Sequence, residues 1–415
     1  MAFQARVLQT AATAGTTDVV AGGFGETAGA MTMVTMATAN GSAVDEAAIS
    51  VGFWDGTNMR SSNCAAEHGE GTSDTQRSQN DGQFVTLKDG NGTDKAIGTV
   101  ANTDNGIRHT WSVDPVAAYL MTTILFGGTA KCATGHLLPT TSGTAVSVSG
   151  LTFRPNFVIF CGISHSSVSD VANSADAVLS MGFASEFDGA IHQRSFGSKS
   201  DNGEGTTSLS GEYSNTLIAG GSGNNTGAEV TAFKDEGFDL TRRDASGAYS
   251  VQYLAVWTDG DPVWVGDFTD GGAGTLNVST GHKPRFGMVI STQFNDATYN
   301  TYANNSRGGS FGIGATDFDT GDEYSVAYAD RHNVGDSDTQ SYTDTKVIHK
   351  PHHDSQDLMI ATVAGRGSDG FSLTYAAGHS RPALALTVGE TEKQLRSTGR
   401  GWGGSLRNRR MSRLG

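Results

Sequence analysis

The stretch EGFDLTRRDASGAYSVQYLAVW (residues 236–257) joins two short apolar segments through a turn-like region rich in Asp, Ser and Gly. Similar stretches occur as DGFSLTYAAGHSRPALALTV (369–388) and NGIRHTWSVDPVAAYLMTTI (105–124). In the segment AYSVQYLAVW, apolar residues occupy both sets of alternate positions, so a strand here would have two apolar faces. We interpret each stretch as a β-hairpin in which two short strands pair through a turn.

Three sequence landmarks recur in the same order with a period of about 130 residues. They are a Gly-Thr pair (Gly15, Gly143, Gly274), a glycine within a strand of small residues (Gly52, Gly182, Gly312) and the glycine that opens the hairpin (Gly106, Gly237, Gly370). A repeat of this kind indicates a tandem array of similar units. We predict modules over residues 1–129, 130–260 and 261–390, with each sheet confined to one module.

The composition favours an all-β fold. The 415 residues include 56 glycines and only 7 prolines, and turn signals such as KDGNGTD, RDASGA and FTDGGAG separate the alternating segments. Short strands joined by tight turns are typical of antiparallel sandwiches, whereas no long segment has helical periodicity. We therefore predict that the three modules are antiparallel, jelly-roll-like β-sandwiches. They should pack side by side, because the joints between them are short.

The sequence also disfavours several classes of protein. No apolar stretch reaches the roughly 18 residues needed for a membrane-spanning helix. The start, MAFQARVLQTAATAG, lacks the cationic region and apolar run of a signal peptide, so we expect synthesis and assembly in a cytoplasm. Cys64, Cys132 and Cys161 have no CxxC spacing, and we interpret them as reduced, mostly buried thiols.

The charge is distributed unevenly along the chain. The net charge is −15, which disfavours a general nucleic-acid binder. Seven cations and no acidic residue follow position 392; without them, 21 basic residues remain against 43 acidic ones, so residues 1–392 carry −22. We predict that residues 391–415 form a basic docking tail that binds an acidic surface of a neighbouring subunit. Its predicted docking residues are Lys393, Arg396, Arg400, Trp402, Leu406, Arg407, Arg409, Arg410 and Arg413.

One short pattern suggests a catalytic nucleophile. GGSFG (308–312) matches G-x-S-x-G, in which a serine, here Ser310, lies on a turn from a strand to a helix. The residues that follow, SFGIGATDFDTGDEY, predict a strand and a turn instead, so we interpret Ser310 as structural. No phosphate loop, paired acid and base or dinucleotide fingerprint is present. We expect no enzymatic activity, no catalytic residue and no cofactor.

Two further patterns suggest a metal ion. HKPHHD (349–354), with His332 and His379, could supply imidazole ligands, and DFDTGDE (317–323) partly resembles a calcium loop. The histidine pattern is confined to one module, and EFDG and WDG occupy the place of DFDTG in the other two. We interpret the histidines as solvated loop residues and the carboxylates as part of a hairpin turn. The sequence therefore predicts no metal site.

The second and third modules resemble a tandem β-sandwich repeat of structural proteins in tailed bacteriophages. That repeat has a G-x-x-V-x-G-L-x-F-x-P strand and a later closing segment like GFTLN…YLAL. The matching residues are GTAVSVSGLTFRP (143–155), GFDLT (237–241) and YLAV (253–256), with GFSLT and LALTV in the third module. The first module departs most, with GIRHT and no Pro-x-Phe, so its membership depends on the period. The resemblance implies a virion building block without catalysis.

We therefore expect a non-enzymatic structural protein of a tailed-phage virion, attached to the tail or the capsid. It would be made and assembled in the host cytoplasm, and its partners would be copies of itself and other virion proteins. The alternative is an adhesion protein of the virion that binds a host glycan or receptor, with Trp54, Trp111 and Tyr299 as aromatic platforms. A polysaccharide hydrolase would need paired carboxylates in a groove, and the sequence nominates no such pair.

Overall fold

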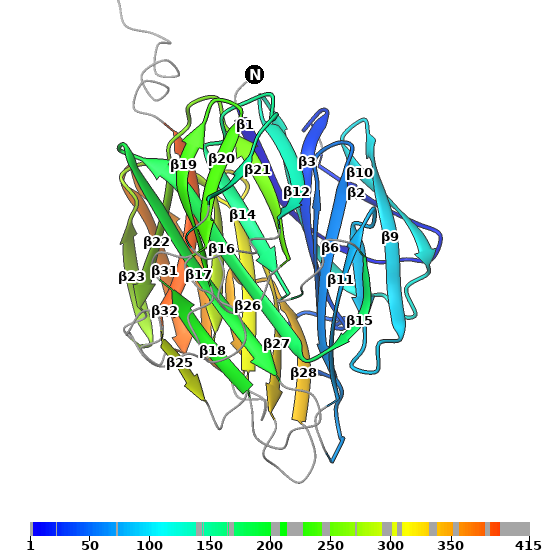
Figure 1. Ribbon diagram of the computed structural model, residues 1–415. Coiled ribbons are helices and arrows are strands. Elements are labelled where there is room, and N and C mark those ends of the chain that lie inside the picture. Colours follow the sequence, from blue (N-terminus) through cyan, green and yellow to red (C-terminus); the bar gives the residue numbers. More distant parts are fainter. Residues whose placement is uncertain are drawn as a thin grey trace, which may run out of the picture.

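The computed structural model (Figure 1) consists of β-strands that pair into antiparallel sheets, without a helix among the residues that it describes. The prediction of an all-β fold is therefore confirmed. The described residues are 3–21, 23–71, 74–137, 143, 145–163, 165, 170–200, 208–213, 227–242, 250–269, 272–292, 301–304, 309–331, 338–351, 357–377 and 382–390.

The first third of the chain supplies most of two sheets. The larger has the order β1-β11-β3-β5-β6-β7-β15 and the smaller has the order β2-β10-β9-β8. Their strands from this third are β1 (Phe3–Ala11), β2 (Thr16–Val20), β3 (Thr27–Thr35), β5 (Ala47–Trp54), β6 (Met59–Ala66), β7 (Thr75–Asp81), β8 (Val85–Lys88), β9 (Asp94–Thr103), β10 (Gly106–Val113) and β11 (Leu120–Gly128).

The second third repeats this arrangement, with the orders β12-β21-β14-β16-β17-β18-β25 and β13-β20-β19. Its strands are β12 (Lys131–Leu137), β13 (Ala145–Val148), β14 (Phe157–Gly162), β15 (Val171–Ala175), β16 (Ala177–Phe187), β17 (Ala190–Ser200), β18 (Ser208–Tyr213), β19 (Ala228–Lys234), β20 (Gly237–Arg242) and β21 (Val251–Trp257).

The last third has the orders β22-β32-β24-β26-β27-β28-β4 and β23-β31-β30-β29. Its strands, together with the short β4 (Val44–Asp45) of the first third, are β22 (Val263–Thr269), β23 (Gly274–Ser279), β24 (Lys283–Thr292), β25 (Thr301–Asn304), β26 (Gly309–Asp317), β27 (Asp322–Arg331), β28 (Asp338–Asp344), β29 (Ile348–Pro351), β30 (Asp357–Arg366), β31 (Gly370–Ala377) and β32 (Pro382–Glu390).

Each larger sheet takes its last strand from a different third of the chain. β15 pairs with β7 and β4 pairs with β28. β25 pairs with β18 (Figure 1). The expectation that every sheet stays within one module is therefore wrong. Each exchanged strand is followed along the chain by a strand of its own third's larger sheet: β5 follows β4, β16 follows β15 and β26 follows β25. The second third gives a strand to the first, the last third gives one to the second, and the first third gives one to the last. The three exchanges are therefore equivalent and close a ring. In this way each exchanged strand covers an edge that would otherwise be open.

The chain turns sharply as it leaves an exchanged strand. Glu46 follows β4 and Asp176 follows β15, and both have positive φ, 77° and 68°. The following residues, Ala47 and Ala177, begin β5 and β16. Left-handed backbone at a residue other than glycine is uncommon, so its occurrence at both corners indicates that each third leaves its neighbour's sheet in the same way.

The interpretation of residues 236–257 as a hairpin is wrong. β20 pairs with β13 and β19, whereas β21 pairs with β12 and β14. The stretch is thus a crossover between the two sheets, and β10–β11 and β31–β32 have the same arrangement. The predicted alternation is confirmed, because Leu254 and Val256 enter one core cluster while Tyr253 and Ala255 enter another.

A single central core joins the three larger sheets. Its side chains come from strands of all three thirds, and the opposite faces of the same sheets pack on the smaller sheets in separate outer clusters. Cys64, Ser198 and Tyr328 lie on β6, β17 and β27, which hold equivalent places in the three sheets. The thiol of Cys64 is 3.7 Å from the hydroxyl of Tyr328, which also bonds to the side chain of Ser198. The core therefore holds the thirds together directly.

Three phenylalanines pack edge-on at one end of this core. The ring centroid of Phe126 is 6.3 Å from that of Phe157 and 5.7 Å from that of Phe286. Phe157 and Phe286 come from the two Pro-x-Phe segments. Their equivalent in the first third is Gly29, which is the strand partner of Phe126. Phe126 thus fills the place of the aromatic ring that the first third lacks at residue 29.

The repeated glycines hold the same backbone in each third. Gly106, Gly237 and Gly370 have φ of 156°, 151° and 156°, and an added Cβ would overlap the carbonyl oxygen of Val19, Val148 or Val278 respectively. One landmark was misassigned. A Cβ at Gly52 would overlap the carbonyl of Phe84, the residue just before β8. In the last third the residue just before β29 is Val347, and its carbonyl would be overlapped by a Cβ at Gly314. The equivalent of Gly52 is therefore Gly314 and not Gly312.

We expect Phe126→Ala to lower the free energy of unfolding by about 3–5 kcal/mol, because the cavity opens in a core that all three larger sheets share. Denaturant unfolding followed by circular dichroism measures the change. Val116→Ala is the control, since Val116 is 67% exposed and its truncation should change stability by less than about 0.5 kcal/mol. Equal stability of the two variants would contradict the shared core.

Candidate functional site

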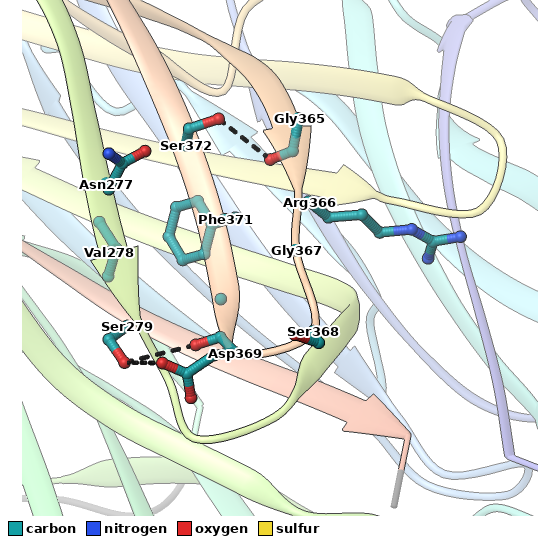
Figure 2. A pocket seen from close by; sticks show the side chains of 11 residues that line it. Asn277, Val278, Ser279, Gly365, Arg366, Gly367, Ser368, Asp369, Phe371 and Ser372 are labelled. Carbon is teal, nitrogen blue, oxygen red and sulfur yellow. Dashed lines mark hydrogen bonds between the residues drawn. The ribbon is translucent and has the colours of Figure 1, made fainter. Parts of the chain in front are cut away.

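A shallow hollow with a volume of about 490 Å³ lies on the smaller sheet of the last third. One wall is β23, through Asn277, Val278 and Ser279, and the other is the hairpin of β30 and β31 from Gly365 to Ser372 (Figure 2). Gly365 and Gly367 leave space over the second wall, because an added Cβ at either would meet no atom closer than 3.7 Å. The hollow thus depends on small residues.

The polar groups of the hollow come from both walls. The hydroxyl of Ser279 donates to a carboxylate oxygen of Asp369 at 2.5 Å, and that of Ser372 donates to the carbonyl of Gly365 at 3.4 Å. Figure 2 shows the first contact at the turn of the hairpin and the second between its two strands. Asn277, Ser279 and Asp369 are exposed, so their remaining donors and acceptors face solvent.

The cation of the hollow is already paired. Figure 2 shows the side chain of Arg366 extending away from Asn277 and Ser279, and its Nη1 donates to Asp319 at 2.6 Å. Burial alone would raise the pKa of Asp319, but hydrogen bonds from Arg366 and Arg285 outweigh it and lower the pKa. Asp369 therefore supplies the one unneutralised charge among the lining residues.

The corresponding surface of the other thirds carries bridging side chains. Asn277 pairs with Ser372 in the last third, whereas Asp18 pairs with Arg108 in the first. Arg108 donates to both carboxylate oxygens of Asp18, at 2.6 and 2.8 Å. In the second third, Asp239 accepts from Ser147 and is paired with Lys234, both at 2.6 Å. In the first and second thirds, charged side chains thus occupy the positions at which the last third has the hollow.

Ser310, the predicted structural serine of GGSFG, lies within β26 and is fully buried. β26 runs on to Asp317 and a turn leads to β27, so the strand-to-helix turn of a nucleophile is not found here. Ser310 is the second residue of β26, and the close approach of this strand to the segment around β29 is made by Gly312 and Gly314, whose added Cβ atoms would meet the carbonyls of His349 and Val347.

His349 does not lie in a solvated loop, so that interpretation is wrong. It belongs to β29, is 4% exposed, and its Nδ1 lies 2.7 Å from Asp344. Burial alone would raise the pKa of Asp344, but hydrogen bonds with His349 and Lys346 lower it to about 2. Nearby, burial raises the pKa of Glu323 to about 7. His332, His352, His353 and His379 lie outside the described residues.

The turn of DFDTGDE binds arginines and backbone amides. Asp317 accepts from the amide of Asp319 at 2.9 Å and from Arg6 of the first third at 3.1 Å. Asp319 accepts from Arg285 and Arg366. The segment is the turn between β26 and β27, as predicted. Among the described residues, no group of His, Cys, Asp or Glu side chains could hold a metal ion.

The cysteines are free thiols, as predicted. Cys64 and Cys161 are buried and Cys132 is half-buried. Burial raises the pKa of Cys64 and of Cys161 to about 12, and it raises the pKa of Cys132 as well. Thiols in this state are protonated near neutral pH and are poor nucleophiles.

Two of the aromatic residues considered for sugar stacking are buried. Trp54 is 2% exposed and Trp111 is 8% exposed, with its indole nitrogen donating to Thr17 at 3.1 Å. These side chains therefore cannot serve as platforms for a sugar. Tyr299 lies outside the described residues, as do all nine predicted docking residues of the tail, from Lys393 to Arg413.

His109 is a buried polar group that the sequence interpretation missed. Its ring lies between Phe84 and Trp111, with both centroids at 5.4 Å, and neither ring nitrogen has a hydrogen-bond partner among the described residues. Burial lowers its pKa to about 4. Counted from the landmark glycine, the same position is Leu240 or Leu373 in the other thirds, so comparing GIRHT with GFDLT and GFSLT would have revealed it.

Comparison with protein-family models gives no match to this chain, and comparison with curated proteins gives no match either. Among the described residues, no helix is long and apolar enough to cross a membrane. The functional assignment must therefore be argued from the hollow, the central core and the distribution of charge.

We expect His109→Leu to raise the free energy of unfolding by about 1–2 kcal/mol at pH 7, because leucine removes two unsatisfied nitrogens from an apolar site. The gain should grow by up to about 3 kcal/mol below pH 4. In the wild type, the unfolded histidine takes up a proton near pH 6.5 and the buried one near 4, so stability falls as the pH decreases through that window.

Denaturant titrations of both proteins between pH 7 and pH 4 measure this difference. Leu373→His is the reciprocal control and should destabilise the fold, since it places an imidazole at the equivalent buried position of the last third. A less stable His109→Leu protein at pH 7 would contradict the assignment of His109 as an unsatisfied core residue.

Proposed function

We propose that this chain is a non-enzymatic structural protein of a tailed-phage virion, attached to the tail or the capsid. Its three β-sandwich modules would act as one pseudo-threefold block. The observation that carries the proposal is the ring of exchanged strands around a common core. Such a block resists deformation, because no third can separate without giving up both a strand and part of its core.

The described surface favours assembly through polar contacts. Val20 and Val116 are the large apolar residues exposed among the described residues, and they do not form an extended apolar patch. Obligate protein interfaces are usually apolar at their centre. A block with this surface would therefore bind its neighbours through charges and through a flanking segment of the chain.

The basic tail is the segment that we propose for this contact. Both ends of the described chain meet at Arg285, which donates to the carbonyl of Phe3 at 3.4 Å and lies 3.7 Å from the carboxylate of Glu390. Glu390, the last described residue before the tail, therefore lies at the same end of the block as Phe3, the first residue of β1. Exposed carboxylates occupy turns of the body, among them Asp188 between β16 and β17 and Asp235 between β19 and β20.

This arrangement would bring unlike charges together between subunits. Residues 393–415, with a charge of +7, would bind the acidic turns of the next block. Arg407, Arg409 and Arg410 would pair with carboxylates, and Trp402 and Leu406 would add apolar contact. Packaged nucleic acid is a less favourable partner, because the body of −22 would repel it. The protein would accordingly reside in the virion, after synthesis and assembly in the host cytoplasm.

A second function is recognition of a host glycan or receptor. It is favoured by the hollow between β23 and the hairpin of β30 and β31, because this opening is lined by small polar residues where the other thirds carry bridging charges. The two functions are compatible, since the tail and the hollow use different residues.

We expect deletion of residues 393–415 to leave a folded body whose unfolding is unchanged, while incorporation into particles falls at least about tenfold, because the charge contact is lost. Association of the full chain should weaken as ionic strength rises from about 0.1 M to about 1 M, over which the Debye length falls from about 10 Å to about 3 Å. Quantitative blotting of purified particles measures incorporation.

A matched pair of variants separates charge from geometry. Replacing Arg407, Arg409 and Arg410 by Lys retains the charge but loses the planar donor groups, whereas replacing them by Gln removes both. Incorporation should fall partly in the first variant and as far as in the deletion in the second. Normal copy number of the deleted protein in particles would refute the docking role.

A further inference from the structure

We propose that the hollow between β23 and the hairpin of β30 and β31 binds a neutral, hydroxyl-rich ligand, namely a saccharide unit of a surface glycan. This inference rests on the recognition function proposed above and is independent of the assembly role. It assigns the ligand chemistry and the residues that would contact it.

The size of the hollow suits a small ligand. Its volume of about 490 Å³ lies within the range of about 300–1,000 Å³ that is usual for small-molecule sites. The opening is shallow and faces solvent, because Asn277, Ser279 and Asp369 on its two walls are exposed (Figure 2). A ligand that remains partly solvated, as one unit of a longer glycan does, fits this shape.

The polar groups match alternating donors and acceptors. The amide of Asn277 donates and accepts, the hydroxyls of Ser279 and Ser372 can do either, and the carboxylate of Asp369 accepts. A sugar hydroxyl is also both a donor and an acceptor. Ser279 already holds Asp369 in place at 2.5 Å, so this carboxylate is oriented before any ligand arrives.

The charge of the hollow disfavours an anion and a metal ion as ligands. Arg366 donates to Asp319 at 2.6 Å and to the carbonyl of Pro284 at 3.2 Å, so it is held outside the hollow. An anionic ligand would meet Asp369 without a compensating cation. A metal ion would find a single carboxylate, and the described residues offer no group of metal ligands. A neutral ligand whose hydroxyls donate to Asp369 therefore fits these groups better than an anion or a metal ion does.

The equivalent positions of the other thirds show that the opening is a local feature of the sequence. Gly365 pairs with Ser372, whereas Ala101 pairs with Arg108 and Ala232 pairs with Asp239. The smaller residues of the last third replace a bidentate ion pair in the first third and a Lys-Asp pair in the second. Restoring such a pair should therefore close the site without disturbing the sheet.

The test uses the full chain and a variant that copies the first third. Asn277→Asp with Ser372→Arg places the pair formed by Asp18 and Arg108 across β23 and β31. The probe is a panel of neutral mono- and disaccharides, measured by saturation-transfer NMR. We expect at least one sugar to bind the wild type with a Kd on the order of 1 mM, as for a shallow site, and the variant to bind at least about tenfold more weakly.

Two further variants make the result decisive. Gly365→Val fills the hollow from the opposite wall and should also abolish binding, because its Cβ has room next to Ser372. Asp18→Asn with Arg108→Ser is the matched control in the first third and should leave binding unchanged. Unchanged melting temperatures establish that each variant is folded.

Three outcomes would overturn the proposal. They are failure of every neutral sugar to bind the wild type, binding that survives both filling variants, and equal or tighter binding of a sialylated or phosphorylated sugar or of an unstructured peptide at the same residues. Because binding is measured on the isolated chain, its failure is distinguishable from failure of the tail to support incorporation into particles.

Discussion

Strands whose two faces are both apolar must be covered on both sides, and the architecture of this protein follows from that requirement. In β21, Leu254 and Val256 face the central core while Tyr253 and Ala255 face the smaller sheet of the same third. A two-layer sandwich alone would expose the first pair to water. The three larger sheets share one core on one face and pack on the smaller sheets with the other, so all six of their faces are covered and little apolar surface is left on the outside.

The ring of exchanged strands solves a second problem, which is the free edge of each larger sheet. The last strand of each sheet would expose unpaired amides and carbonyls along its length, and such edges invite aggregation. β15 pairs with β7, and the two-residue β4 pairs with Gln340 and Ser341 of β28, so the neighbouring third satisfies part of these groups. Side chains reinforce the joints: Ser341 of β28 donates to the carbonyl of Glu46 at 2.8 Å, and Arg77 of β7 donates to that of Asp176 at 3.0 Å.

The sequence predicted what depends on local pattern. Alternation and turn residues identified the all-β class and the strands around Gly237 correctly, because side-chain period and left-handed glycines are local properties. Strand partners were not predictable: β20 and β21 look like a hairpin, yet they join different sheets. The exchanged strand β15, VANSA, has no apolar alternation and so gave no signal. The hollow could be recognised only from the strand pairing, which shows that Asn277 of the last third holds the position of Asp18 in the first. Its distinguishing property is the absence of charged side chains that the other thirds carry at these positions.

The ring has a consequence for the order of events during synthesis. β4 (Val44–Asp45) leaves the ribosome long before its partner β28 (Asp338–Asp344), which lies in the last third of the chain. Domains in a tandem array usually fold one after another as they emerge. Here the first third must keep residues 44–45 unpaired, and the core face of its larger sheet uncovered, until nearly the whole polypeptide has been made. Translation speed and chaperone occupancy over the last 150 or so residues would then govern yield, in contrast to an array of independent domains of the same length.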